Sequence, residues 1–250
     1  VQEMTSLAGM NGFLSNVMHA YGNVYSMGTF IDGTDTDNGI FFKTAKFHFI
    51  SNTRIRTSLR DINEFKIVHV NYPADTLRIF SVHLKSSSGA VNENQRASEV
   101  DSLRKFTSTL PANSFYMVVG DFNIYGDYEP AYFKLKQVTS GNGHFTDAIS
   151  MTGSWNQFQY RQYHTQSPRT RGFGGGSTGG MDDRFDMILM SPGIFNAGRI
   201  AYVPGTMTPY GNDGNHYNDS INRRPNTAVP DSVADAIHYA SDHIPVIATF

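Results

Sequence analysis

The sequence predicts a β-rich α/β protein with long polar loops, and three observations support this. Aromatic residues are plentiful, with 18 Phe and 13 Tyr among 250 residues, which is typical of sheets rather than of helical bundles. Several short runs alternate between apolar and polar side chains, the period of a half-buried strand. One longer segment, 92–110, spaces its apolar residues as a helix does.

The totals limit the classes of protein that are possible. The length suffices for one large domain or two small ones, and the absence of an internal repeat or linker favours a single domain over 1–250. The net charge of −2 provides no global positive field, so a polyanionic substrate has to be held by local Arg and Lys residues and a bound metal. The absence of cysteine excludes disulfides, thiolate metal sites and a Cys nucleophile. No apolar run approaches transmembrane length.

The first half of the chain predicts strands followed by a β–α–β unit. The predicted strands are 39–43, 46–50, 65–71 and 77–83, the last two forming a hairpin around a turn at 72–75. Segment 92–110 is the predicted helix, because it has helical spacing and ends before Pro111. A buried strand at 117–119 follows it.

The second half is richer in loops. Its predicted elements are a short helix at 129–135, a loop over 136–183, strands at 184–190 and 200–203, a polar loop over 204–230, a helical turn at 231–237 and a closing strand at 244–250.

Residues 120–123 (Gly-Asp-Phe-Asn) form the stretch around which the chain is organised. Gly120 allows a sharp turn after the buried strand. If the extended conformation continues, strand alternation points Asp121 and Asn123 to the same side. A carboxylate and a carboxamide leaving a strand together suit a hydrated cation and a phosphate oxygen. Asp and Asn after a strand are also ordinary turn residues, and that alternative stays open.

Other candidate side chains also lie at predicted strand ends. Glu3 suits a metal ligand or an exposed terminal residue, and His83 suits a functional or a structural histidine. The acidic run 32–39 lacks the downstream bidentate Glu of a calcium loop, so we interpret it as an acidic turn.

The loop at 160–171 is rich in basic and aromatic residues, the types that phosphate contacts and base stacking need, although a solvated loop is the alternative. The Gly-rich run 172–180 precedes no helix and lacks a Lys-Ser/Thr ending. It is therefore predicted to be a flexible flap and not a P-loop.

Taken together and in order, these motifs resemble the endonuclease/exonuclease/phosphatase (DNase I-like) superfamily. The motifs that carry the resemblance are Glu3 after Gln2, His83 in 83–87, Gly-Asp-Phe-Asn at 120–123, Arg-Phe-Asp at 184–186 and Ser-Asp-His at 241–243. The similarity covers the whole chain, and its loops look most like those of secreted bacterial nuclease-type members. It implies a four-layer α/β sandwich, in which two packed, mixed, mainly antiparallel sheets are flanked by helices.

The resemblance also implies roles for particular residues. The implied catalytic residues are His83, Asp121, Asn123, Asp186, Asp242 and His243; the substrate-binding residues are Lys85, Tyr163, His164 and Arg169; and the metal ligands are Glu3 and Asp242. Asp121 would orient or deprotonate the attacking water, and Asp242 would support the metal or pair with a histidine. The family leaves the division of acid and base roles between its Asp and His residues open.

The implied cofactor is Mg²⁺ or Mn²⁺, with Ca²⁺ as a further, structural ion, and the implied partner is a nucleic acid substrate. We expect a monomer that is secreted or periplasmic and makes no membrane contact. The family begins with a strand ending in an Asn, then a helix, before the strand that bears the Glu. This sequence starts close to Glu3, so we expect that strand and helix to be missing from it.

The leading hypothesis is a secreted, metal-dependent phosphodiesterase that cleaves DNA or RNA. The alternative within the superfamily is a phosphatase or a lipid phosphodiesterase. The alternative from another class is a binding module that has lost catalysis.

Overall fold

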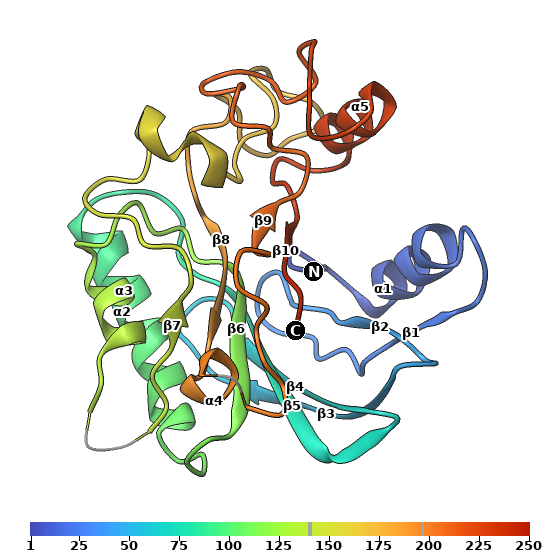
Figure 1. The fold of residues 1–250 in the computed structure, drawn as a ribbon, viewed down its shortest axis with the longest axis vertical. Helices are drawn as coiled ribbons and strands as arrows, with labels where there is room; N and C mark the ends of the chain where they lie inside the picture. Colours follow the sequence, from blue (N-terminus) through green and yellow to red (C-terminus); the bar gives the residue numbers. More distant parts are fainter. Residues whose placement is uncertain (140–141, 197) are drawn as a thin grey trace.

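A computed structural model describes residues 1–139, 142–196 and 198–250. Its centre is a six-stranded sheet in the order β3-β4-β5-β6-β8-β7 (Figure 1). The strands of this sheet are β3 (Phe47–Ile55), β4 (Ile62–His69), β5 (Tyr72–His83), β6 (Phe115–Asp121), β7 (Thr146–Asp147) and β8 (Asp186–Met190). Among the described residues, only β5 and β6 pair in parallel in this sheet, and the other neighbours are antiparallel. The sheet is therefore mixed and mainly antiparallel.

Two helices, one long and one short, cover one face of this sheet. They are α2 (Ala90–Thr107) and α3 (Pro130–Lys136), which lie together beside the sheet in Figure 1. Side chains that alternate along the strands, such as Phe80 on β5 and Val118 on β6, point into the core formed with Leu103 and Leu135 of the helices. Burial of this shared apolar surface fixes the helical layer on the sheet.

The opposite face carries a second, smaller β layer. It consists of two antiparallel pairs, β1 (Tyr25–Met27) with β2 (Phe41–Lys43) and β9 (Thr208–Pro209) with β10 (Val246–Ile247). Met117 of β6 and Met190 of β8 point to this side and pack with Val246 of β10. The predicted α/β fold with two packed sheets and outer helices is thus confirmed, with the second sheet present as two short pieces.

The remaining helices surround this framework. They are α1 (Leu7–Phe13), a π-helical stretch η1 (Leu14–Met18), a 3-10 helix η2 (Phe158–Tyr163), α4 (Pro192–Phe195) and α5 (Asp231–Ala240). None of the helices in the described residues is both long and apolar enough to cross a membrane.

Local differences from the predicted elements have physical reasons. The predicted turn at 72–75 lies inside β5. Val68 of β4 pairs with Thr76, but the next residue, His69, pairs with Tyr72, so residues 73–75 form a bulge. Pro73, which has no N–H to donate, therefore needs no partner on β4. The predicted strand at 200–203 is irregular backbone whose apolar side chains still pack on the core. Of the predicted closing strand at 244–250, only β10 is extended and paired.

A buried ion pair joins the edge strand β7 to the segment before β8. Asp147 accepts hydrogen bonds from both terminal nitrogens of Arg184, at 2.8 and 2.9 Å, and both side chains are buried. Removing one partner leaves the other charge without compensation inside the protein.

We predict that Asp147→Ala lowers the free energy of unfolding by about 3–5 kcal/mol in chemical denaturation, because it leaves the Arg184 guanidinium buried without a charged partner. Asp101→Ala is the matched control, since it breaks the largely exposed Lys134–Asp101 pair and should cost no more than about 1 kcal/mol. An unchanged denaturation midpoint for Asp147→Ala would show that the buried pair contributes nothing.

Candidate active site

The register of three neighbouring strands places three polar side chains in a row. The parallel pairing of β5 with β6 sets His83 opposite Asp121, because the carboxyl ends of parallel strands meet at one edge. Strand β8 runs antiparallel to β6 and begins at Asp186, which pairs with Asp121. The sheet therefore brings together two carboxylates and an imidazole from segments far apart in the sequence.

The backbone at 120–123 turns as soon as β6 ends. Gly120 has φ 130°, and a Cβ there would lie 2.1 Å from the carbonyl oxygen of Val82, so only glycine fits between the strands. Asn123 has φ 51°, and both its backbone N–H and its side-chain amide donate to Asp121 at 2.9 Å. Asp121 and Asn123 thus meet through an Asx-type turn and not through continued strand alternation.

His243 lies against both carboxylates of this row. Its Nδ1 is 2.7 Å from Asp186 Oδ2, and its Nε2 is 3.8 Å from Asp121 Oδ2. Burial alone would lower the pKa of His243, but the charges of Asp186, Asp121 and Asp242 raise it to about 10. His243 is therefore a cation at neutral pH that donates Nδ1–H to Asp186.

The pKa values of Asp121 and His83 shift so as to reduce charge in the buried row. Burial, followed by the negative charge of Asp186, raises the pKa of Asp121 to about 7. Burial, followed by the positive charges of Arg60 and His243, lowers the pKa of His83 to about 4. His83 is thus a neutral imidazole whose Nε2 lies 3.5 Å from Asp121. Such opposed shifts are typical of acid–base sites.

Glu3 is the open carboxylate at the edge of this cluster. Its side chain is 63% exposed, and its Oε1 lies 3.8 Å from His83 Nδ1. Across the residues that the structure describes, no group of three or more His, Asp or Glu side chains is arranged to hold a metal ion. A hydrated Mg²⁺ needs only one or two carboxylates plus substrate phosphate. The donor set therefore fits a weakly held, hydrated ion at Glu3 and not a preformed cage.

Asp242 lies under the Gly-rich segment instead of beside another acidic ligand. Its carboxylate accepts a hydrogen bond from the backbone N–H of Ser177 at 2.6 Å and lies 4.0 Å from Arg169. A Cβ on Gly176 would lie 2.6 Å from the carboxyl carbon of Asp242, so glycine is required there. The predicted flap is thus anchored at Asp242, and the predicted metal-ligating role of Asp242 stays a prediction.

Two of the four predicted substrate-binding residues are buried structural groups. His164 is fully buried, and its two ring nitrogens face the carbonyl oxygens of Trp155 and Met181. Arg169 is buried and donates to the carbonyl of Phe173 at 2.8 Å. That these two residues contact substrate stays a prediction. The ring nitrogens of His164 are satisfied inside the protein, whereas Nε of Arg169 is buried without a hydrogen-bond partner among the described residues.

The other two remain candidates for substrate contact. Tyr163 is half-buried and packs against the main core cluster. Lys85 is half-buried and lies two residues after His83 in the chain. Its Nζ donates to the carbonyl of Ser86.

Sequence reasoning missed three residues that support the site. Gln166 places its side-chain amide against Nε2 of His243. Arg96 of α2 is fully buried; it donates to Glu129 and to the carbonyls of Lys85 and Ser87. Arg96 and Glu129 therefore fix the loops after β5 and β6. The only signal in the sequence was the charge of Arg96 and of Glu129, and a charge does not reveal burial.

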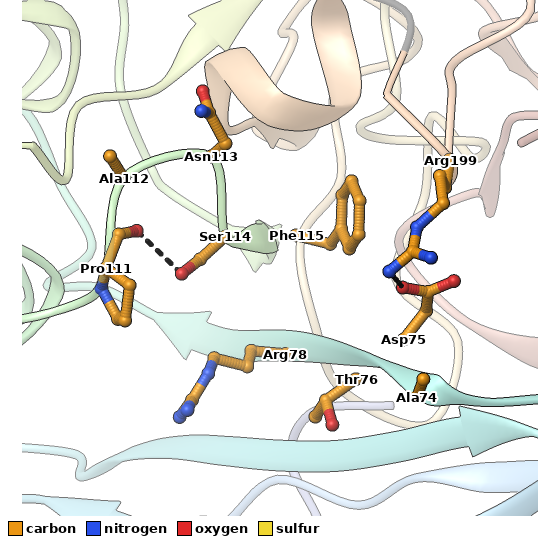
Figure 2. Close-up of a pocket in the computed structure, with 10 residues that line it drawn as sticks. All are labelled: Ala74, Asp75, Thr76, Arg78, Pro111, Ala112, Asn113, Ser114, Phe115 and Arg199. Carbon is orange, nitrogen blue, oxygen red and sulfur yellow. Dashed lines mark hydrogen bonds and ion pairs between the residues drawn. The ribbon is translucent and has the colours of Figure 1, made fainter.

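A surface pocket of about 300 Å³ lies away from this cluster (Figure 2). It is formed by the N-terminal half of β5, by the loop 111–114 with the first residue of β6, and by Arg199, whose guanidinium pairs with Asp75 at 2.5 Å. The catalytic candidates lie at the opposite ends of the same two strands. This pocket is therefore separate from the candidate active site.

No protein-family model matches the chain, and no curated protein matches it. Solved structures do. TDP2 of D. rerio complexed with single-strand DNA product is 16% identical with a TM-score of 0.57, over 99% of this chain and 83% of that one. A mannosyl-6-phosphatase of Bacteroides thetaiotaomicron is 15% identical with a TM-score of 0.56, over 100% of this chain and 84% of that one. An endonuclease/exonuclease/phosphatase family protein of the same species is 14% identical with a TM-score of 0.53, over 97% of this chain and 79% of that one.

These likenesses define the class of fold. The chain has the DNase I-like α/β fold, with a mixed central sheet, a smaller second β layer and outer helices. The resemblance inferred from the sequence motifs, to the endonuclease/exonuclease/phosphatase superfamily, is confirmed at the level of the fold.

We predict that NMR titration of His243 gives a pKa near 10 and that Asp186→Asn lowers it by several units, because the carboxylate that offsets burial is gone. A raised folded-state pKa stabilises the fold fully below the ordinary value of 6.5, and this contribution is lost as pH rises through about 10. The control is Asp61→Asn, which removes a carboxylate paired with Arg54 and should leave His243 unchanged. A wild-type pKa near 6.5 would contradict the assigned pairing.

Proposed function

We propose that the protein is a hydrolase of phosphoric esters. The observation that carries the proposal is the His243 imidazolium, held by Asp186 next to Asp121 and Asn123, at the joined strand ends of a DNase I-like fold. A half-buried cation, a carboxyl group with a raised pKa and an amide converge there, as in-line attack on phosphorus requires.

The residues of the site have complementary roles in the proposed reaction. Asp121 orients the attacking water and, when ionised, accepts its proton as the oxygen–phosphorus bond forms and the bond to the leaving alkoxide breaks. Asn123 positions the water and the phosphate. The His243 imidazolium offsets the negative charge that develops on the phosphate oxygens, and Asp186 keeps it protonated and oriented.

A divalent ion such as Mg²⁺ or Mn²⁺, held at Glu3 together with the substrate phosphate, would supply Lewis-acid neutralisation of the phosphate charge. The exposure of the Glu3 carboxylate supports this assignment. Because a single open carboxylate holds Mg²⁺ weakly, the ion is expected to bind mainly with substrate.

Nucleic acid is the substrate that we propose first. Phe173 and Tyr239 form an edge-to-face pair with centroids 5.0 Å apart, and they remain 52% and 54% exposed. Arg169 donates to the carbonyl of Phe173 and lies 4.0 Å from Asp242, next in the chain to the candidate histidine. Exposed aromatic rings near a phosphate site suit stacking of unpaired bases, and one neighbour of the same fold is TDP2 complexed with single-strand DNA product.

A phosphatase acting on small phosphomonoesters is the second candidate. The net charge of −2 gives no global attraction for a polyanion, and another neighbour of the same fold is a mannosyl-6-phosphatase. Export from the cell remains part of the proposal through the resemblance of the motifs and loops to secreted nucleases.

The first test is cleavage of supercoiled plasmid, single-stranded oligonucleotides and RNA, with Mg²⁺ and with EDTA. We predict that His243→Ala lowers kcat/KM by roughly 10²- to 10⁴-fold, because the imidazolium is lost from the site. His48→Ala, which alters an exposed histidine on β3, is the matched control and should retain full activity. Hydrolysis of small phosphomonoesters alone would favour the phosphatase. Inactivity toward every ester would refute the proposed function.

We also predict a bell-shaped dependence of kcat/KM on pH. Activity should rise as Asp121 ionises near pH 7 and fall as His243 loses its proton near pH 10. Asp186→Asn should move the alkaline limb to lower pH, because it removes the charge that keeps His243 protonated. An alkaline limb that stays in place in this variant would contradict the role given to His243.

A further inference from the structure

Arg60 lies in a well-ordered turn that leads from β3 into β4. The hydroxyl of Thr57 donates to the carbonyl of Arg60 at 2.7 Å, and the backbone N–H of Thr57 donates to the Asp61 carboxylate at 3.2 Å. These bonds hold the backbone of the turn, so the arginine side chain is presented from a fixed position.

The Arg60 guanidinium reaches the edge of the sheet that carries the catalytic candidates. Its Nη1 lies 3.5 Å from the carbonyl oxygen of Leu84, the residue after His83. The same oxygen accepts a hydrogen bond from Nδ2 of Asn123 at 3.2 Å. Because both donors share one acceptor, the guanidinium lies next to the Asn123 amide. Its charge also acts on His83, whose pKa it lowers after the larger effect of burial.

The charge of Arg60 is only partly compensated. Its side chain is 15% exposed, and its Nε lies 3.1 Å from Asp35 but makes no aligned hydrogen bond. A guanidinium has five N–H donors in a planar fork, and the hydrogen-bond and ion-pair partners found for this one are the Leu84 carbonyl and the more exposed Asp35. Its charge also acts on the buried Glu99, whose pKa burial raises and the Arg60 charge lowers. Donors therefore remain for an anion, and the fork matches phosphate oxygens.

We propose that Arg60 is a phosphate-binding residue of the active site, with its guanidinium on a non-bridging oxygen of the phosphate that Asn123 and His83 face. The chemical class of ligand is a phosphate group, free or esterified. This inference rests on the proposed function for the identity of the site, but binding of phosphate can be tested without turnover.

The experiment is a titration of the wild-type chain and its variants with inorganic phosphate, in which isothermal calorimetry measures the binding. Arg60→Gln is expected to weaken binding roughly tenfold or more, since it removes a charge-assisted bond, and Arg60→Lys is expected to recover part of the loss. Arg56→Gln is the matched control, because Arg56 is exposed in the same turn, and it should bind phosphate as the wild type does. Thermal unfolding of each variant checks that the fold is intact.

Asp35→Asn separates a phosphate ligand from a structural ion pair. If Arg60 binds phosphate, loss of the competing carboxylate should tighten binding roughly threefold. If Arg60 serves only to pair with Asp35, both Asp35→Asn and Arg60→Gln should weaken binding alike, which would overturn the inference. Unchanged binding in Arg60→Gln, or no phosphate binding by the wild type, would also overturn it. Phosphate binding that depends on Arg60 in a protein that hydrolyses no ester would uphold the inference and refute the proposed function.

Discussion

The parallel pairing of β5 with β6 is the constraint on which the rest of the structure depends. In the part of the chain that the structure describes, it is the only parallel contact between neighbours in the central sheet, and it requires a crossover, which α2 supplies. The pairing sets His83 beside Asp121, and the antiparallel strand β8 then adds Asp186 to the row. The crossover helix also contributes to the site, because its buried Arg96 holds the loop after β5 in place.

The charges of the site are arranged around one neutral and one ionised imidazole. His83 and His243 both lie near Asp121, yet their pKa values are displaced in opposite directions. Asp186 makes a direct hydrogen bond to His243 and raises its pKa, whereas burial, followed by the positive charges of Arg60 and His243, lowers the pKa of His83. Two residues of the same type thus acquire different chemical states because the sheet places them beside different partners.

The sequence predicted the framework better than the surroundings of the site. Glycine at 120 was expected to turn the chain after a buried strand, but Gly120 still pairs within β6, which ends at Asp121, and the turn follows at Asn123. Glycine is required at 120 because the close approach of Val82 admits no side chain there. The pairing of Asp186 with His243 joins positions 57 residues apart, and no local spacing in the sequence encodes it. The helix α1 and the stretch η1 were missed, since their apolar residues lack a clear period.

Burial was the property that residue types did not reveal. His164 and Arg169 have side chains suited to phosphate, yet both are buried: carbonyl oxygens face both ring nitrogens of His164, and Nη1 of Arg169 donates to the carbonyl of Phe173. Arg60, which no motif included, is the arginine that reaches the catalytic edge. A polar residue in a loop is assigned to substrate or to structure by tertiary contacts that neither composition nor local spacing encodes.

The residues of the site are widely separated in the sequence, and this makes the site useful as an experimental probe of folding. Its members lie at positions 3, 83, 121, 186 and 243, on segments that meet only in the completed sheet. A fragment or a partly assembled form would lack whole members of the cluster rather than hold a weaker version of it. The titration of the His243 imidazole therefore reports integrity of nearly the entire polypeptide, which makes one side chain a sensor of complete assembly.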